Sequence, residues 1–236
     1  MQYMRAYQFI TDSKNYFMNV LMGVVCSLIP FIGGIVYDGY LFEVIDSLHE
    51  DPDHRDYPDF DFNRFTTYLM RGLWPFLANL ILSLLVAVPI VLATYALIIV
   101  GVLVFHGGVM TYVCIAAAIV LGLVGSVVLA LIELPMIIHA GLARELRFKE
   151  MLAFARDFVP RMWKEELLVV LFLMVTAPIL SMIGVCAFFV GVYFAAVVID
   201  MATHHFYFQL YELYLKRGGS PIRRAGESTV SEVEAV

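Results

Sequence analysis

Residues 72–132 read GLWPFLANLILSLLVAVPIVLATYALIIVGVLVFHGGVMTYVCIAAAIVLGLVGSVVLALI, without a single Asp, Glu, Lys or Arg. A helix needs about 20 apolar residues to cross a hydrocarbon core of about 30 Å, so this stretch is long enough for two crossings and a turn. Near its middle, His106-Gly107-Gly108 is the segment that is typical of a turn. The sequence therefore predicts one helix at about 72–104 and the next at about 110–140.

The whole chain has the composition of an integral membrane protein. Of its 236 residues, 61% are hydrophobic and 15% are charged, whereas ordinary soluble domains are about half apolar and a quarter charged. No period-2 alternation is visible, which favours helices over barrel strands. The net charge of −6 excludes a basic nucleic-acid-binding surface, and all three cysteines lie in apolar runs, which argues against a disulfide framework.

Two further uncharged runs extend this pattern. The run 167–199 divides most naturally near Ser181–Gly184, which predicts helices at about 161–182 and 185–214. The run 15–37 contains Pro30, Gly33 and Gly34, and a proline followed by paired glycines predicts a sharp helix break. Two interpretations remain open for this segment, namely one kinked span or a hairpin that enters and leaves the membrane on the same side.

The distribution of Lys and Arg favours the hairpin. With a hairpin, all 15 basic residues lie on one side of the membrane, which the positive-inside rule assigns to the cytoplasm. We therefore expect an all-α polytopic bundle with a re-entrant hairpin, four long transmembrane helices and one interfacial helix. Both termini are then cytoplasmic, residues 1–215 form one membrane-embedded domain, and 216–236 form a disordered tail. The long helix at 72–104 is expected to tilt, or to kink at Pro89.

The interfacial helix is expected within residues 144–166. Apolar side chains recur there at helical spacing from Phe148 to Met162, which is typical of an amphipathic helix. The basic residues that could face anionic lipid headgroups are Arg147, Lys149, Arg156 and Arg161. The alternative is a connector that packs on its own bundle.

An acidic segment at 46–62, DSLHEDPDHRDYPDFDF, precedes the long apolar stretch. Hard divalent cations prefer such oxygen ligands, but the segment has no EF-hand spacing and contains Arg55. A solvated loop interrupted by Pro52 and Pro58 is the interpretation that we favour.

A few polar side chains interrupt the apolar helices, and such residues are functional candidates by default. They are Glu133, His139, Asp200, His204 and His205, and Asp38 lies just after the Gly33-Gly34 break. Asp200 and His204 are four residues apart, so they share one helix face, which we expect to point into the bundle. No motif of a known hydrolase is present, so we expect no catalytic residue, no metal and no cofactor. Instead, Asp200 is expected to accept a hydrogen bond from His204 or a neighbouring helix.

Pairs of small residues within the spans predict close helix approach. Gly122 and Ser126 are four residues apart, and Gly184 and Gly191 are seven apart, so each pair is expected to line one side of a helix. The partner could be another helix of this chain or a second protomer.

The order of these features resembles domain-of-unknown-function family 4013, a group of prokaryotic membrane proteins. The resemblance is carried by the first run with Pro30 and Gly33-Gly34, by Gly39-Tyr40, Tyr57-Pro58-Asp59-Phe60, Phe65 and Arg71-Gly72-Leu73, and near the end by Gly191, Tyr193, His205, Gln209 and Tyr211. It covers most of residues 14–214. It implies a multi-helix protein of the prokaryotic cytoplasmic membrane and assigns no reaction.

Three classes of function remain open from the sequence. The first is a non-enzymatic protein that organises membrane or scaffolds a complex, with anionic lipids, a second copy or other membrane proteins as partners. The second is a small transporter or channel component, for which a broken helix and intramembrane polar groups are typical. The third is a metal-dependent intramembrane hydrolase. We favour the first, and nucleic acid is not expected as a partner.

Overall fold

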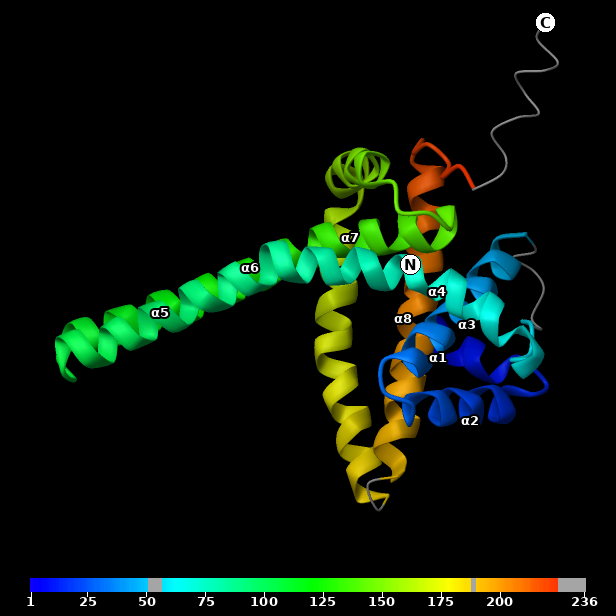
Figure 1. Cartoon of the computed structure of the whole chain (residues 1–236), viewed down its shortest axis with the longest axis horizontal. Coiled ribbons are helices and arrows are strands. Elements are labelled where there is room, and N and C mark those ends of the chain that lie inside the picture. The colour runs from blue at the N-terminus through cyan, green and yellow to red at the C-terminus, as the bar shows by residue number, and fades with distance from the viewer. Residues whose placement is uncertain (51–56, 188–189, 225–236) are drawn as a thin grey trace, which may run out of the picture.

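The computed structural model describes residues 1–50, 57–187 and 190–224, and within these ranges every regular element is helical (Figure 1). The elements are α1 (Arg5–Gln8), η1 (Phe9–Thr11), α2 (Tyr16–Ser27), α3 (Ile32–Glu50), η2 (Phe62–Arg64), α4 (Phe65–Leu82), η3 (Ser83–Ala87), α5 (Val88–Phe105), α6 (Val109–Ala143), α7 (Phe148–Cys186) and α8 (Val190–Lys216). The expected all-α class is confirmed.

The long apolar stretch forms a helical hairpin, as predicted. Helices α4 and α5 follow each other without interruption, the chain turns at 106–108, and α6 runs back alongside α5 (Figure 1). In the turn, Gly107 has φ +84°, a conformation that glycine adopts without strain. The junction η3 is a π-helical turn just before Pro89, and π turns and prolines are the usual causes of helix bends.

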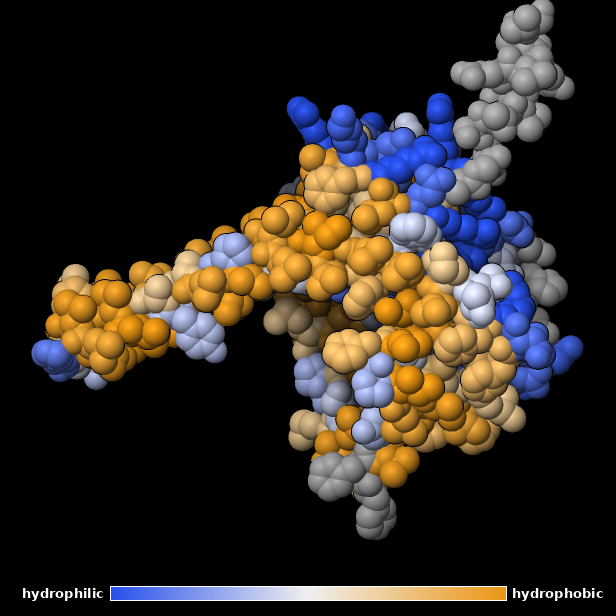
Figure 2. All heavy atoms as spheres, viewed as in Figure 1, coloured by the Kyte–Doolittle hydropathy of each residue, from blue (hydrophilic) through white to orange (hydrophobic). Residues whose placement is uncertain are grey.

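The α5–α6 hairpin extends away from the rest of the molecule, and its visible surface is almost uniformly hydrophobic (Figures 1 and 2). Only 6% of the most apolar 18-residue window of each of these two long helical segments is buried within the protein. A surface of this kind is compatible with a lipid environment or with a protein partner.

Helices α7 and α8 form a second hairpin, which diverges from the first (Figure 1). The predicted turn at Ser181–Gly184 is wrong, because α7 continues to Cys186. Gly184 instead faces Gly191 of α8, and a Cβ atom on Gly184 would lie 2.6 Å from the Gly191 carbonyl oxygen. These two glycines therefore bring facing helices together, rather than lining one side of a single helix or making the turn.

The first apolar run is divided into two helices. The chain breaks at 28–31, which includes Pro30, and α3 then packs against α2. Gly33 and Gly34 lie just beyond the break, inside α3, and a Cβ atom on Gly33 would lie 1.8 Å from the Cys26 carbonyl oxygen. The break is thus a tight helical turn, whereas its entry into the membrane remains a prediction.

Two other boundaries differ from the sequence-based expectation. Residues 46–50 belong to α3 and not to a loop, because Asp46 is buried in ionic contacts, while 51–56 lie outside the described residues. The expected helix start at about 161 is also wrong, because α7 begins at Phe148 and contains Pro160 in its interior. The first turns of α7, seen end-on in Figure 1, nevertheless run in a different direction from the rest of that helix.

Helix α8 is the structural centre of the molecule. One buried cluster packs α8 against α3, α6 and α7, and a second packs it against α2, α3 and α4. Three helical segments, Phe62–Phe105, Val109–Ala143 and Phe148–Cys186, are long and apolar enough to cross a membrane. Within the described part of the chain, α8 is comparably long, but it carries the polar residues Asp200, His204 and His205.

Candidate functional site

A histidine lies between two carboxylates where α3 meets α8. Asp200 and His204 are one turn apart on α8, and the Nδ1 atom of His204 is 3.3 Å from Asp200 Oδ1 and 3.0 Å from the Asp200 carbonyl oxygen. On the other side of the ring, Nε2 is 4.0 Å from Oδ1 of Asp38 on α3. The imidazole therefore joins two acidic groups from different helices.

The contact between Asp200 and His204 follows from their spacing along α8, since residues i and i+4 share a helix face. The approach of Asp38 to His204 comes instead from tertiary packing of α3 against α8. The His204 side chain is only 7% exposed, whereas those of Asp38 and Asp200 are 36% and 39% exposed. The histidine is thus enclosed, and the carboxylates remain accessible from outside the helix interface.

Asp200 lies deep along α8. It is the tenth residue after Val190, where the helix begins, so it lies about 15 Å along the axis at about 1.5 Å per residue. That is about half of a hydrocarbon core of about 30 Å. If α8 crosses the membrane, Asp200 and His204 lie near its middle.

A further polar side chain lies beside this site. Tyr207 follows His204 by one turn, and the two ring centroids are 5.2 Å apart. Tyr207 therefore covers one side of the His204 ring.

Glu166 of α7 is an unusual polar residue. It is fully buried, and neither of its carboxylate oxygens has a hydrogen-bond partner among the described residues. A buried carboxyl group without a partner is costly and calls for a functional explanation.

The arrangement at Asp38, Asp200 and His204 permits two kinds of chemistry. A histidine between two carboxylates can accept, hold and release a proton, because its charge changes near neutral pH in ordinary surroundings. Alternatively, one ligand atom from each residue could bind a metal ion, since these atoms lie within 4.8 Å of one another. We refer to Asp38, Asp200 and His204 as the polar site.

The other predicted polar residues do not join the polar site. His139 of α6 packs against Phe154 of α7, with ring centroids 5.5 Å apart. His205 stacks on Phe9 with centroids 4.4 Å apart, and its Nδ1 atom lies 3.0 Å from Nε2 of Gln209. The structure therefore brings Asp200 and His204 of α8 together with Asp38, a residue just beyond the helix break.

The basic residues of α7 lie on its exposed side. Arg147 forms ion pairs with Glu145 and Glu150, Arg161 pairs with Asp157, and Lys149 and Arg156 are exposed. On the opposite side, Met151, Phe158 and Met162 are buried against the protein, while Phe148 and Leu152 are exposed. The apolar side of α7 thus packs on its own bundle, and contact of the basic side with lipid remains a proposal.

Sequence reasoning missed a second ionic cluster, centred on Asp46. Its carboxylate accepts hydrogen bonds from Arg71 at 2.5 Å, from Arg144 at 2.9 Å and from Arg224 at 3.4 Å. Arg71 also donates to the carbonyl oxygen of Phe42 at 2.7 Å. The signal available in the sequence was Arg71 itself, a charge placed directly before an uncharged stretch.

Comparison with known proteins supports the resemblance noted in the sequence. Residues 22–191 match the sequence profile of a family described as proteins of unknown function, DUF4013, and the match covers more than half of the chain. The chain belongs to this family. The DUF4013 match includes Asp38 and Arg71 and ends before Asp200 and His204. No curated protein and no solved structure matches the chain significantly.

Proposed function

We propose that this membrane protein is a small transporter or channel component that passes protons through Asp38, His204 and Asp200. The observation that carries the proposal is the enclosed imidazole between two accessible carboxylates on different helices. Ionisable residues inside a membrane are rare and commonly belong to ion pathways or proton relays.

The helix break next to the polar site supports the same function. In many transporters, ion sites lie near the membrane middle and next to discontinuous helices. Here the break at 28–31 leads into α3, and Asp38 follows within two turns. The proposal includes the expected orientation, in which α8 crosses the cytoplasmic membrane and both termini are cytoplasmic.

The test is proton flux into vesicles that contain the purified full-length protein and a trapped pH dye. A potassium diffusion potential supplies the driving force. We expect the wild type to conduct protons, and Asp38→Asn and Asp200→Asn to reduce the flux to that of empty vesicles. Glu150→Gln removes an exposed carboxylate on α7 and serves as the control with unchanged flux.

Thermal stability in detergent separates this function from a purely structural role. Asp200→Asn keeps shape and some hydrogen bonding, so a transport carboxylate should lose flux in this variant with little change in Tm. Wild-type flux no higher than that of empty vesicles would contradict the proposal. A Tm that falls much further in Asp200→Leu than in Asp200→Asn would point to a structural hydrogen bond instead.

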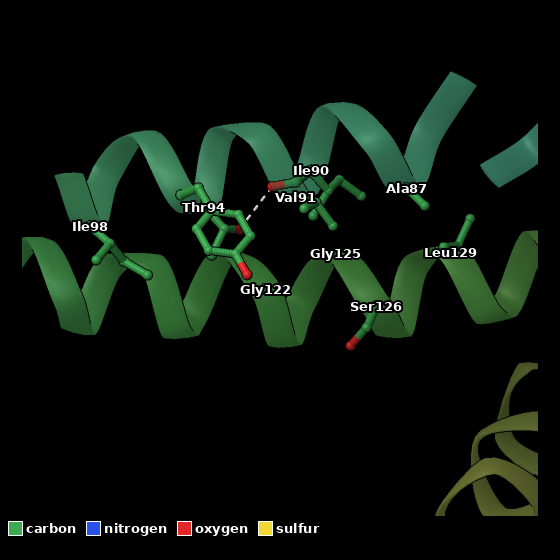
Figure 3. Close-up of a pocket in the computed structure, with 10 residues that line it drawn as sticks. Ala87, Ile90, Val91, Thr94, Ile98, Gly122, Gly125, Ser126 and Leu129 are labelled. Atoms are coloured by element: carbon green, nitrogen blue, oxygen red, sulfur yellow. Dashed lines mark hydrogen bonds between the residues drawn. The ribbon is translucent and has the colours of Figure 1, made fainter. Parts of the chain in front are cut away.

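A second candidate function is organisation of the membrane or of a protein complex, which the exposed α5–α6 hairpin favours. The open groove between the two helices, about 360 Å³ in volume, is lined mainly by apolar side chains (Figure 3). Within it, the Thr94 hydroxyl donates to the Ile90 carbonyl oxygen at 2.8 Å, so even this polar group is satisfied locally. The mass of the protein in detergent distinguishes a stable oligomer from a monomer.

The third candidate, a metal-dependent hydrolase, makes a separate prediction. It requires a metal ion at Asp38, Asp200 and His204, the three residues with suitable spacing. Elemental analysis of the purified protein tests this requirement, and stoichiometric metal would favour the hydrolase over proton transfer.

A further inference from the structure

A second pocket lies on the side of the molecule where the basic residues gather, between α3, α4 and the end of α6. It has a volume of about 260 Å³, and its lining includes Arg64, Thr67, Arg71, Trp74 and Arg144, together with Glu43. The polar site at Asp200 shares no residue with this pocket, so the inference that follows is independent of proton transfer.

Positive charge exceeds negative charge around this pocket. Three arginines line it, whereas Glu43 is the one acidic residue in its described lining and is held in a two-point ion pair with Arg64. Behind the pocket, Asp46 is shared among Arg71, Arg144 and Arg224. Arg224 also pairs with Glu50, so with the Arg64–Glu43 pair four guanidinium groups face three carboxylates. The remaining positive charge is one that an anion would complement.

Arg71 supplies an independent sign of a missing ligand. Its side chain is 6% exposed, and its Nε atom is buried without a hydrogen-bond partner in the part of the chain that the structure describes. The Nη2 atom, in contrast, donates to the Phe42 carbonyl oxygen and to Asp46. An unsatisfied buried donor is costly, and an acceptor bound in the pocket that Arg71 lines could remove that cost.

The neighbouring residues identify the kind of anion. Guanidinium groups bind phosphate through paired donors, and Thr67 adds an exposed hydroxyl. Trp74 also lines the pocket, and tryptophan is enriched where the membrane meets water. Met70, another lining residue, is 52% exposed and offers an apolar surface to an acyl chain.

We propose that this pocket binds the phosphate group of an anionic membrane lipid. Arg71 and Arg144 hold the phosphate, Arg64 and Thr67 contact the headgroup, and Met70 and Trp74 face the first part of the acyl chains. Basic pockets between membrane helices on the cytoplasmic side bind anionic headgroups in this way. The site differs from the exposed basic side of α7, which offers charge without an enclosing pocket.

The test uses full-length protein in detergent, with lipid binding followed by native mass spectrometry and by the change in Tm. The probes are phosphatidylglycerol, phosphatidylcholine and inorganic phosphate. We expect one phosphatidylglycerol to remain bound and to raise Tm, with neither effect from phosphatidylcholine. Inorganic phosphate should raise Tm far less, because it lacks the acyl chains. An equal rise with inorganic phosphate would assign the pocket to a free anion and overturn the lipid proposal.

Two pocket variants and one control make the assignment specific. Arg64→Gln/Arg144→Gln should lower phosphatidylglycerol binding to the level of phosphatidylcholine. Thr67→Glu should do the same while leaving every ion pair of Asp46 in place, which covers the case in which the double variant fails to fold. The control, Lys164→Gln/Lys216→Gln, removes the same charge at two exposed residues outside the pocket and should bind as the wild type does. Wild-type binding by Thr67→Glu, or equal loss in the control, would overturn the proposal.

Discussion

At the scale of single residues, two acidic side chains of α3 connect it to other helices: Asp38 lies near His204, and Asp46 pairs with Arg71 and Arg144. The contact between Asp200 and His204 follows from their spacing, because four residues make about one helical turn. Asp38 and Asp46 could not be assigned in the same way, since their partners come from α4, α6 and α8. Such pairings depend on tertiary packing, which no local pattern encodes.

Asp46 is the residue whose substitution should cost the most stability. Its side chain is 7% exposed and neutralises the buried Arg71. Removing one partner of a buried ion pair costs about 3–5 kcal/mol, because the other charge remains buried without compensation. We therefore expect Asp46→Asn to lower the free energy of unfolding in detergent by about that amount.

Arg147 provides the comparison for Asp46. It also forms ion pairs, with Glu145 and Glu150, but its side chain is 44% exposed. Arg147→Gln should leave the unfolding transition nearly unchanged, because exposed ion pairs contribute little. Equal destabilisation by Asp46→Asn and Arg147→Gln would show that burial does not determine how much the Asp46 cluster stabilises the fold.

At the scale of helices, the sequence predicted the α5–α6 hairpin and the break near Pro30 because both rest on strong local signals. The sequence-based prediction placed the α7–α8 turn too early, because glycine occurs both in turns and at close helix contacts. Gly184 lies at a close contact between α7 and α8 and not in the turn. The prediction also ended α3 too early, because the acidic composition of 46–50 concealed the buried position of Asp46.

Close packing of α3 on α4 yields a prediction about two glycines. A Cβ atom on Gly72 would lie 1.8 Å from the Ile35 carbonyl oxygen, so Gly72→Ala must push the two helices apart. Overpacking typically costs about 1–3 kcal/mol, and we expect a loss of unfolding free energy in that range. Thermal unfolding in detergent measures it.

Gly34→Ala is the matched control for Gly72→Ala. Gly34 also lies in a helix, but nothing lies within 4 Å of the place that its Cβ atom would occupy. Alanine favours helix over glycine by about 0.5–1 kcal/mol, so this variant should be slightly stabilised. If the two substitutions changed stability by the same amount, close contact between α3 and α4 would not explain the effect of Gly72→Ala.

At the scale of the whole molecule, both proton transfer at Asp200 and lipid binding at the arginine pocket require one orientation in the membrane. The α5–α6 and α7–α8 hairpins have apolar tips, near 106–108 and near Cys186. No Lys or Arg lies in the uncharged runs 72–132 and 167–199 that contain these tips, so the basic residues all lie in other segments. In the proposed orientation, Asp200 lies near the middle of the membrane and the phosphate pocket faces the cytoplasm. Composition and charge asymmetry predict this orientation, which remains a prediction, because the positive-inside rule acts on the entire chain rather than on a local structure.

The most direct test is side-specific cysteine labelling in intact cells with a membrane-impermeant maleimide. The exposed Cys186 marks one hairpin tip after Cys26 and Cys114 are replaced, Gly108→Cys marks the other tip, and Lys149→Cys marks the basic side. We predict that Cys186 and the cysteine at Gly108 react in intact cells, and that the cysteine at Lys149 reacts only after permeabilisation. Labelling of Lys149→Cys in intact cells, with both tips protected until permeabilisation, would contradict the orientation on which the account rests.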